Sequence, residues 1–532
     1  MNNENTFDNI FKITYEDLKT AGLTDGEIAA DRIFMYANPT FGRNITDYQT
    51  EPLVEIPRNI SNDAATFKTG DFLYFYGKSP SGLYVDHTNK LKFQRNPYSF
   101  ENYFWILIAD NAGNPRSIEK AAKSNSTPEY TITKTDYLSR KGKENYNVLD
   151  SGNDWYNKIF AERGATATEV FNLPPADNDY SADISFSLKS GSSDNVGRQY
   201  YKIYLNNTVI NEASTFDYSK VTGRVTGSLR PHNNTFRVEF YYGNGIGYLD
   251  YIQCEYEISL DNFTDNIKFI APPESGTIEY QLTENYPDSP RIFDVTDPLN
   301  IREIQIDHTA NNVDFTDDNP AGARKSYLMV SETNYSEPDN IQEFSSPDFN
   351  SLYDFKNAQY VIITDESLLP AAEKIANIHS SQVRDEDQLS TFVTTQSQIF
   401  RQFNADVQDP AAIRNFLKYA YDNWEVKPEY VLLLGDGSYD HRKIKTDTKN
   451  HVMTYQNYYY SWGYYYYATD FFYTFLSESD NIPDVAIGRI PASDLEEANN
   501  YVEKLEDYII NPEFGSWRNT FSLVADEIGR AH

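Results

Sequence analysis

Four polar side chains lie close together in one short segment: Asp436, Ser438, Asp440 and His441. An acid, a hydroxyl and an imidazole are the groups of a hydrolytic triad, but a triad brings them together from different elements. Neighbours in one loop point in several directions, and this segment lacks the final glycine of a nucleophile elbow. We therefore interpret the segment as a tight turn after a strand, with Gly435 supplying an unusual backbone angle.

Two alternatives remain open for the same segment. Asp436 and Asp440 are candidate ligands of a calcium ion, or contacts to a substrate, because carboxylate oxygens suit this hard cation. An acidic hydrolase that uses Asp436 or Asp440 would lose its activity on the change Asp436→Asn.

Cys254 is the only cysteine, which excludes an internal disulfide framework and a cysteine-based metal cluster. It lies in a segment, residues 248–260, where apolar and polar side chains alternate as in a half-buried strand. Cys254 shares the apolar face with Ile252 and Tyr256, whereas a catalytic thiolate needs a partly exposed, electropositive setting. We expect a structural role for it.

A glycine-rich segment, Gly243–Gly247, faintly resembles a dinucleotide-binding loop. It precedes a strand and lacks the helix whose amino terminus would hold a pyrophosphate. The pattern predicts a hairpin turn.

Aromatic residues crowd the segment between residues 457 and 475, and they include Tyr459, Trp462 and Tyr465. Tyrosine and tryptophan offer large amphipathic contact areas, so these three are candidates for a rim that binds substrate or partner. The alternative is a long loop that folds its own aromatic side chains over the edge of a sheet.

The elements that must position these residues alternate between strand and helix from about residue 355. Apolar strands are predicted at 360–363, 391–395, 430–434, 484–487 and 521–525. Helices are predicted to begin at Pro370, at Asp409 with Pro410, and at a capping box of Ser493 and Glu496. This alternation indicates a parallel α/β sheet covered on both faces, with its chemistry at the carboxyl ends of the strands.

The first 350 residues show short strand patterns and almost no helical period. The predicted fold class is therefore multidomain: β-rich amino-terminal domains followed by an α/β parallel sheet that we expect to be incomplete. We expect an amino-terminal β-rich domain at 1–130, β-sandwich-like domains with a linker at 131–350, and the α/β domain at 355–532.

The composition limits the classes of partner. With 46 Lys and Arg against 79 Asp and Glu, the net charge is −33, which disfavours binding to nucleic acid and to anionic membrane surfaces. Aromatic residues make up 15% of the chain, as expected for a folded protein. No apolar run approaches the roughly 20 residues of a transmembrane helix, and the amino terminus does not resemble a signal peptide.

Several motifs in their order resemble the gingipain-type cysteine peptidases, whose catalytic domain is caspase-like. The closer likeness is to the surface sortases of the type IX secretion system of Bacteroidetes. The segments that carry the resemblance are Phe11–Leu23, Thr69–Gly77, Asn96–Ser99, Phe293–Pro298, Gln408–Arg414, Tyr430–Asp440 and Asp484–Pro491.

This resemblance implies an extracellular or outer-membrane surface endopeptidase that cleaves sorting signals of exported proteins. It implies protein or peptide substrates, other secretion-system components as partners, and no required cofactor. The family uses a cysteine paired with a histidine, usually in a His-Gly dipeptide. None of the seven histidines here precedes glycine. We therefore expect the catalytic His and Cys to lie beyond residue 532, the chain alone to be inactive, and Asp526 or Glu527 to match the family's supporting acid.

A second hypothesis makes the chain a noncatalytic surface-binding protein with a degenerate α/β domain. A His-Gly dipeptide and a further cysteine encoded after residue 532 would favour the enzyme, and a stop codon would favour the binding protein.

Overall fold

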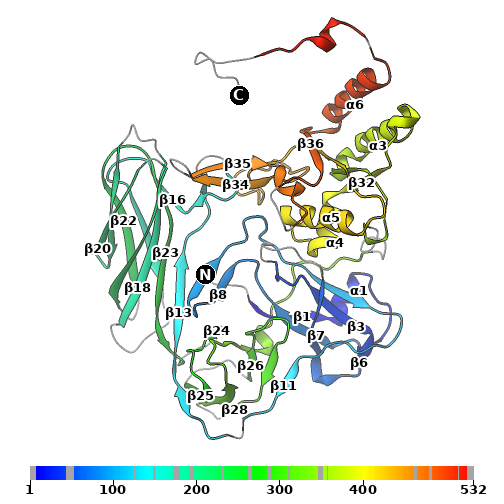
Figure 1. Cartoon of the computed structure of the whole chain (residues 1–532). Helices are drawn as coiled ribbons and strands as arrows, with labels where there is room; N and C mark the ends of the chain where they lie inside the picture. Colours follow the sequence, from blue (N-terminus) through cyan, green and yellow to red (C-terminus); the bar gives the residue numbers. More distant parts are fainter. Residues whose placement is uncertain are drawn as a thin grey trace.

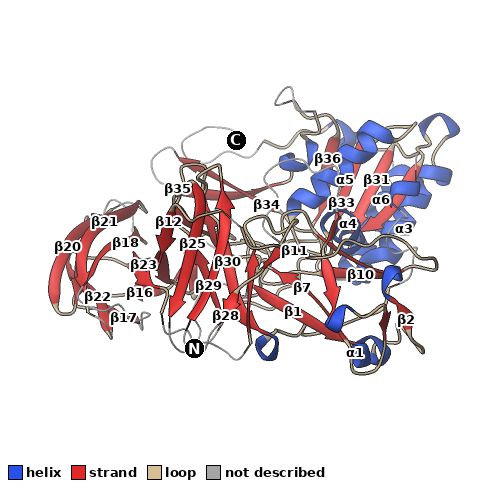
Figure 2. Cartoon of the chain, turned by 90° about the horizontal axis from the view of Figure 1, so that it is seen from below, coloured by secondary structure: helices blue, strands red, loops and turns tan. Residues whose placement is uncertain are grey.

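The computed structural model describes residues 8–42, 53–124, 126–147, 151–171, 180–191, 197–216, 218–230, 233–261, 266–283, 289–308, 312–344, 352–355, 357–460, 464–477, 482–512 and 514–523. Helices gather at one end of the molecule and a β-sandwich forms the other end (Figure 2). The strand-rich first part and the later parallel sheet confirm the predicted fold class. Within the described ranges, no helix is long and apolar enough to cross a membrane.

Small antiparallel sheets form the first part of the chain, in the orders β1-β7-β5 and β10-β3-β4, with β2-β6 and β8-β9 as pairs. Helix α1 (Tyr15–Thr20) begins at Thr14, whose hydroxyl accepts from the Asp17 N–H while the Asp17 carboxylate accepts from the Thr14 N–H. The strands are β1 Asn9–Thr14, β2 Ile28–Ala29, β3 Ile33–Ala37, β4 Val54–Ile56, β5 Arg58–Ile60, β6 Thr66–Phe67, β7 Phe72–Gly77, β8 Gly82–Val85, β9 Leu91–Gln94 and β10 Phe104–Ile108.

The middle of the chain is built on one sheet of ten strands in the order β11-β27-β26-β30-β24-β13-β23-β18-β21, with β16 pairing to β23. Two four-stranded sheets, β17-β22-β19-β20 and β12-β25-β29-β28, pack on it through separate apolar cores. The strands are β11 Glu119–Ala121, β12 Tyr130–Ile132, β13 Lys134–Lys141, β14 Tyr146–Asn147, β15 Trp155–Tyr156, β16 Lys158–Phe160, β17 Thr166–Phe171, β18 Tyr180–Ser190, β19 Gln199–Leu205, β20 Thr208–Thr215, β21 Lys220–Leu229, β22 Asn234–Tyr242, β23 Gly247–Ser259, β24 Ile267–Ile270, β25 Gly276–Thr283, β26 Pro290–Asp294, β27 Arg302–Ile304, β28 Asp307–His308, β29 Asn312–Asn319 and β30 Ser326–Ser331.

Strand β23 carries Cys254 as predicted, because alternate side chains along it are buried and Cys254 is fully inaccessible. The prediction for Gly243–Gly247 is half right. Gly243 and Gly245 adopt positive φ in a turn, but β22 and β23 belong to different sheets, so the turn is not a hairpin.

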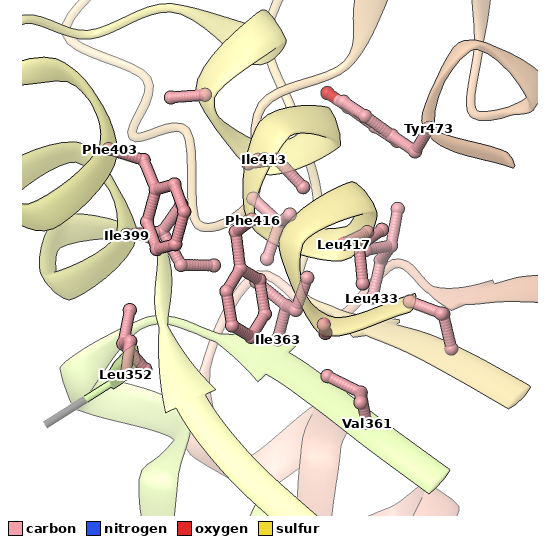
Figure 3. Packing of buried hydrophobic residues seen from close by; sticks show 14 of the residues in the cluster. Leu352, Val361, Ile363, Ile399, Phe403, Ile413, Phe416, Leu417, Leu433 and Tyr473 are labelled. Atoms are coloured by element: carbon pink, nitrogen blue, oxygen red, sulfur yellow. The ribbon is translucent and has the colours of Figure 1, made fainter. Parts of the chain in front are cut away.

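The last part of the chain is a parallel sheet in the order β32-β31-β33-β36, with all strands in parallel pairs. Alternate residues of β31 and β33 face opposite helical layers: Val361, Ile363 and Leu433 pack with α4 and α5, as Figure 3 shows, and Ile362 and Leu432 pack with α3 and α6. The elements are β31 Tyr360–Thr364, α3 Leu369–Asn377, β32 Thr391–Thr395, α4 Gln396–Asn404, α5 Pro410–Asn423, β33 Tyr430–Leu434, β34 Tyr455–Tyr460, β35 Tyr464–Thr469, β36 Ala486–Ile490 and α6 Leu495–Ile509. Figure 1 labels the four helices with β32, β34, β35 and β36, and Figure 2 labels β31 and β33.

Four local predictions in this part need correction. Helix α4 was not predicted, and the segment predicted as a long loop contains the β34–β35 hairpin. The cap of α6 lies one residue later than predicted, since Asp494 accepts from the Glu497 N–H. Phe521–Leu523, the described part of the strand predicted at 521–525, has no regular structure, and the side chains of Phe521 and Leu523 are 94% and 90% exposed. The domain boundaries near 130 and 350 stay predictions.

Candidate functional site

The segment after β33, residues 435–454, lies at the carboxyl edge of the parallel sheet and is named the β33–β34 loop. Gly435 begins it with φ of +138°, and a Cβ there would meet the His451 Cβ at 2.5 Å, so a side chain is excluded. The Gly435 N–H donates to the Ile490 carbonyl of β36, and the Gly435 carbonyl accepts from Arg489. These bonds fix the first turn of the loop against the sheet.

The polar residues predicted in this loop have separate partners. The Asp436 carboxylate lies 2.6 Å from Nδ1 of His451, a residue that the sequence pattern does not single out. The Ser438 hydroxyl accepts from the Asp440 N–H at 3.1 Å. The structure therefore does not bring Asp436, Ser438 and His441 together as a triad.

Asp440 is an anchor of the loop backbone. It is fully inaccessible, and its carboxylate accepts from the N–H groups of Ile444, Lys445 and Thr446 at 2.6–2.9 Å. A carboxylate that already accepts three hydrogen bonds has little capacity left for a cation. Within the described stretches, no group of three or more His, Cys, Asp or Glu residues is arranged to hold a metal ion.

His441 is buried where three parts of the chain meet. Its ring packs edge-on against Tyr98 from the amino-terminal part, with ring centroids 5.4 Å apart. Among the residues that the structure describes, neither ring nitrogen has a partner in good hydrogen-bond geometry, although the Asn450 side chain lies near enough to favour the protonated ring. Burial, and then the neighbouring charge of Arg442, lower the pKa of His441 to about 4, although the nearby Asn450 acts in the opposite direction. The neutral ring is therefore a packing group at ordinary pH.

Arg442 connects the β33–β34 loop to the middle of the chain. Its guanidinium donates to both carboxylate oxygens of Glu144, at 2.5 and 2.8 Å, and its side chain is only 2% exposed. It also donates to the Asn96 carbonyl at 3.2 Å and lies over the Phe100 ring at 4.7 Å. The Arg442 side chain thus contacts both the amino-terminal part and the middle part of the chain.

The β14–β15 segment packs directly on the same loop. Gly152 has no room for a side chain, since a Cβ there would lie 2.8 Å from the Tyr439 carbonyl oxygen and 2.9 Å from the His441 ring. The rings of Trp155 and Tyr439 stack with centroids 6.3 Å apart. We call these contacts, together with Tyr98 and the Arg442–Glu144 pair, the junction.

The junction determines what the carboxyl edge can do. In open α/β sheets this edge is the usual ligand site, but here the β33–β34 loop is covered by Tyr98, Glu144 and Gly152. Among the polar residues described in this loop, the Asp436–His451 pair is the group that could still take part in chemistry. Its carboxylate lies at Nδ1 of His451 and orients the imidazole, as a carboxylate does for a histidine that acts as a general base. Sequence spacing carries no signal for His451, because 15 residues separate it from Asp436.

Cys254 cannot act as a nucleophile in this structure. It is fully inaccessible on β23, and burial raises the pKa of its thiol to about 12, with Asp183 and Glu255 adding to the shift. A thiol in this state is protonated at neutral pH.

The remaining predicted site residues are only partly described. Tyr459 and Tyr465 pair with each other across the β34–β35 hairpin, and their side chains lie outside the described part. Trp462, Asp526 and Glu527 also lie outside the described residues. The base of the hairpin is fixed by Tyr455, which stacks on Phe472 at 3.8 Å.

Comparisons with known proteins agree with this architecture. Residues 353–532 match the model of peptidase family C25. The crystal structure of dimeric latent PorU from Porphyromonas gingivalis superposes with a TM-score of 0.77 at 20% identity, covering 97% of this chain and 50% of that chain. An uncharacterized protein of Archaeoglobus fulgidus is 26% identical over 176 residues, which are 31% of this chain and 38% of that one. The chain therefore spans half the length of the PorU chain and 38% of the length of the curated relative.

The predicted resemblance is confirmed at this level: the chain has a PorU-like fold, and its α/β region matches the model of the gingipain-type peptidase family C25.

Proposed function

We propose that this chain, with its C25-type region at 353–532, is the amino-terminal portion of a gingipain-like cysteine endopeptidase at the cell surface. Its task would be to remove sorting signals from exported proteins. The observation that carries the proposal is the PorU-like fold over 97% of the chain, since this includes the β domains as well as the α/β region.

The catalytic pair is proposed to lie in residues other than these 532. Two observations support this. Cys254 is buried in the β-sandwich with a protonated thiol, and no histidine precedes glycine. The 532-residue chain by itself is therefore expected not to hydrolyse peptides.

Other features of the function are proposals of the same kind. Asp526 or Glu527 would support the catalytic histidine, and Tyr459, Trp462 and Tyr465 would contact substrate or partner. No cofactor is required, and the calcium predicted at Asp436 or Asp440 is proposed at Asp436 alone, because the Asp440 carboxylate already accepts from three backbone N–H groups. Protein or peptide substrates and other components of a type IX secretion system are the expected partners, outside the cell or at the outer-membrane surface.

A noncatalytic surface-binding protein is the second candidate. The observation that favours it is the junction, because side chains from the two preceding parts of the chain cover the β33–β34 loop.

The deciding experiment measures cleavage of a fluorogenic peptide taken from the carboxyl-terminal sorting region of an exported protein. We expect no turnover by the 532-residue chain. We expect turnover by the complete product of the source gene, abolished by thiol alkylation and retained in the variant Cys254→Ala. Turnover by the 532-residue chain that survives Cys254→Ala would contradict the proposal. Absence of turnover in the complete product would favour the binding protein.

A further inference from the structure

Lys189, near the end of strand β18, and Asp154, just before strand β15, form an unusually buried ion pair. The Lys189 Nζ donates to Oδ2 of Asp154, and the two side chains are only 1% and 5% exposed. In every other lysine–carboxylate pair between described residues, the lysine side chain is at least 14% exposed. Water therefore has little access to the amine and the carboxyl group of this one pair.

Aromatic rings and a second cation surround the Lys189 amine. The centroid of the Tyr156 ring lies 5.8 Å from Nζ, and Tyr248 is the cross-strand neighbour of Lys189 on β23. Lys220 is its neighbour on the other side, on β21. Burial lowers the pKa of Lys189; Asp154 opposes this shift, and the charge of Lys220 adds to it. The surroundings thus favour the neutral amine, which is the nucleophilic form of lysine.

The Asp154 carboxyl group has a donor on each of its two oxygens. Lys189 donates to Oδ2, and the Tyr156 hydroxyl donates to Oδ1. Tyr156 is itself only 1% exposed. A donor on a carboxyl oxygen stabilises the negative charge that this oxygen gains when a nucleophile attacks the carbon. The three side chains therefore bring together an amine, an electrophilic carboxyl group and a donor for the oxyanion.

A covalent link between the two side chains would also remove an energetic cost. Two charges are expensive to keep out of water, and their attraction repays this cost only when the geometry is very good. An amide formed from the pair carries no charge, and its oxygen would keep the hydrogen bond from Tyr156. Cys254 is the only cysteine, so an internal disulfide cannot cross-link this chain.

We propose that Lys189 and Asp154 condense to an isopeptide bond between Nζ and Cγ. A proton first passes from the ammonium group to the carboxylate, and the neutral amine then attacks Cγ. The bond from Nζ to Cγ forms, the bond from Cγ to Oδ2 breaks, and Oδ2 leaves as water with the carboxyl proton and one amine proton. Tyr156 stabilises the oxyanion on Oδ1. The reaction needs no oxidant, reductant or other reactant.

The bond would join the β-sandwich to the segment that contacts the α/β region. Strand β18 belongs to the sandwich at one end of the molecule (Figure 1). Gly152 lies against Tyr439, and Asn153 donates to the Gln456 carbonyl, so the two residues before Asp154 both reach the α/β region. The cross-link therefore anchors the junction covalently on the sandwich side. It would form whether or not the chain is part of a peptidase.

The test is the intact mass of the denatured 532-residue chain. We expect a mass lower by one water than the mass calculated from the sequence. We also expect a branched tryptic peptide that joins residues 144–158 to residues 164–198, uncut after Lys189. Tandem mass spectrometry of this peptide should place the link at Lys189 and Asp154.

Two variants test the chemistry of the link. Lys189→Arg keeps the buried charge pair, but a guanidinium does not condense with a carboxyl group, so its mass should equal the calculated mass. Tyr156→Phe removes the donor to Oδ1 and should slow formation of the link about a hundredfold, measured by intact mass at intervals after a pulse of cell-free synthesis. Circular dichroism of each variant checks that the fold is retained.

Lys268→Arg is the matched control. It makes the same substitution in the Lys268–Asp8 pair, whose side chains are 15% and 0% exposed. Its mass should still be one water lower than calculated, because the Lys189–Asp154 pair is intact.

Three outcomes overturn the proposal. They are a wild-type mass equal to the calculated mass, a deficit of one water that persists in Lys189→Arg, and a branched peptide that joins other residues. An aspartyl succinimide also lacks one water and forms readily at Asp-Gly, so a deficit located at Asp25-Gly26 or Asp436-Gly437 would assign the loss to a succinimide instead. An unchanged rate in Tyr156→Phe would overturn the role given to its hydroxyl.

Discussion

Arg442 and Glu144 are 298 residues apart in the chain and form a largely buried pair with two hydrogen bonds, their side chains being 2% and 14% exposed. Removing two charges from water is costly, so such a pair is not strong evidence of stability by itself. The pair matters most when one partner is lost, because the other charge then remains buried without compensation.

We therefore expect Glu144→Leu to lower the free energy of unfolding by about 3–5 kcal/mol. Urea denaturation followed by intrinsic fluorescence provides the measurement. The double variant with Arg442→Met should recover part of the loss, since it removes the more buried of the two cations that Glu144 pairs with, the other being Arg95 at 3.6 Å. Asp63→Asn, which breaks the exposed Lys120–Asp63 pair, is the matched control and should cost about 1 kcal/mol or less. A loss of similar size in both variants would show that burial of the junction pair is unimportant.

His441 should make stability depend on pH in acid. The pKa of its ring is about 4 in the folded protein and near 6.5 when unfolded, so between these values the unfolded chain binds the extra proton. Stability is unaffected by this group above about pH 6.5 and decreases as the pH falls towards 4, by roughly 3 kcal/mol in total.

The measurement is the urea midpoint between pH 7 and pH 4. In His441→Gln the decrease over this range should be smaller than in the wild type. His87→Gln, at an exposed position, should track the wild-type curve. An identical decrease of the urea midpoint with falling pH in the wild type and in His441→Gln would contradict this account.

At the level of elements, the β14–β15 segment and the β33–β34 loop touch through a glycine. Because backbone and a buried ring lie within 3 Å of where its Cβ would be, Gly152 sets how closely the two segments approach. The base of the β34–β35 hairpin is reached by the same segment, since Asn153 donates to the Gln456 carbonyl.

Gly152→Ala should therefore separate these elements. We expect a loss of about 1–3 kcal/mol, as for other overpacked positions, and faster amide exchange at residues 439–446. Gly26→Ala is the control, because a Cβ there meets no atom within 4 Å and the backbone is compatible with alanine. It should be neutral or slightly stabilising. Unchanged exchange at 439–446 in Gly152→Ala would contradict the proposed contact.

Sequence reasoning identified the strands and helices with strong apolar periodicity, such as β33, α5 and β23. It missed α4, where buried Gln402 and Asn404 interrupt the apolar pattern, and it missed the hairpin in a run of aromatic residues without alternation. It also could not find the junction, because the contacts of Tyr98, Glu144 and Gly152 with the β33–β34 loop arise only from tertiary packing. The expectation that Asp436, Ser438 and His441 are not a triad needed only local geometry, and it agrees with the structure.

The molecule as a whole is less modular than its domain order suggests. Tyr98 comes from the amino-terminal part, yet it belongs to the core of the parallel sheet and is only 7% exposed. The Asn38 side chain donates to Asn404 on α4, and the Trp105 indole donates to the Ala405 carbonyl. We expect the amino-terminal part and the C25-type region to unfold together.

Tyr98→Ala tests this expectation. It removes a buried ring and should lower the stability of the parallel sheet by about 3–5 kcal/mol. The measurement is amide exchange of β33, a strand distant from Tyr98 in the sequence. Tyr84→Ala, at a position 39% exposed, is the control and should leave exchange of β33 unchanged. If amide exchange of β33 is the same in Tyr98→Ala as in the wild type, the amino-terminal part and the C25-type region are separate folding units.

The bond between Asn38 and Asn404 has a consequence for how the protein is made. At the roughly 5–20 residues per second of synthesis, Asn38 leaves the ribosome some tens of seconds before Asn404 exists. Strand β1 lacks one of its final contacts for almost as long, because the Asn9 side chain donates to Ser336, which is synthesised much later. The beginning of the chain must therefore persist without its final contacts while most of the polypeptide is produced, and closure of the molecule is a late event in its biogenesis.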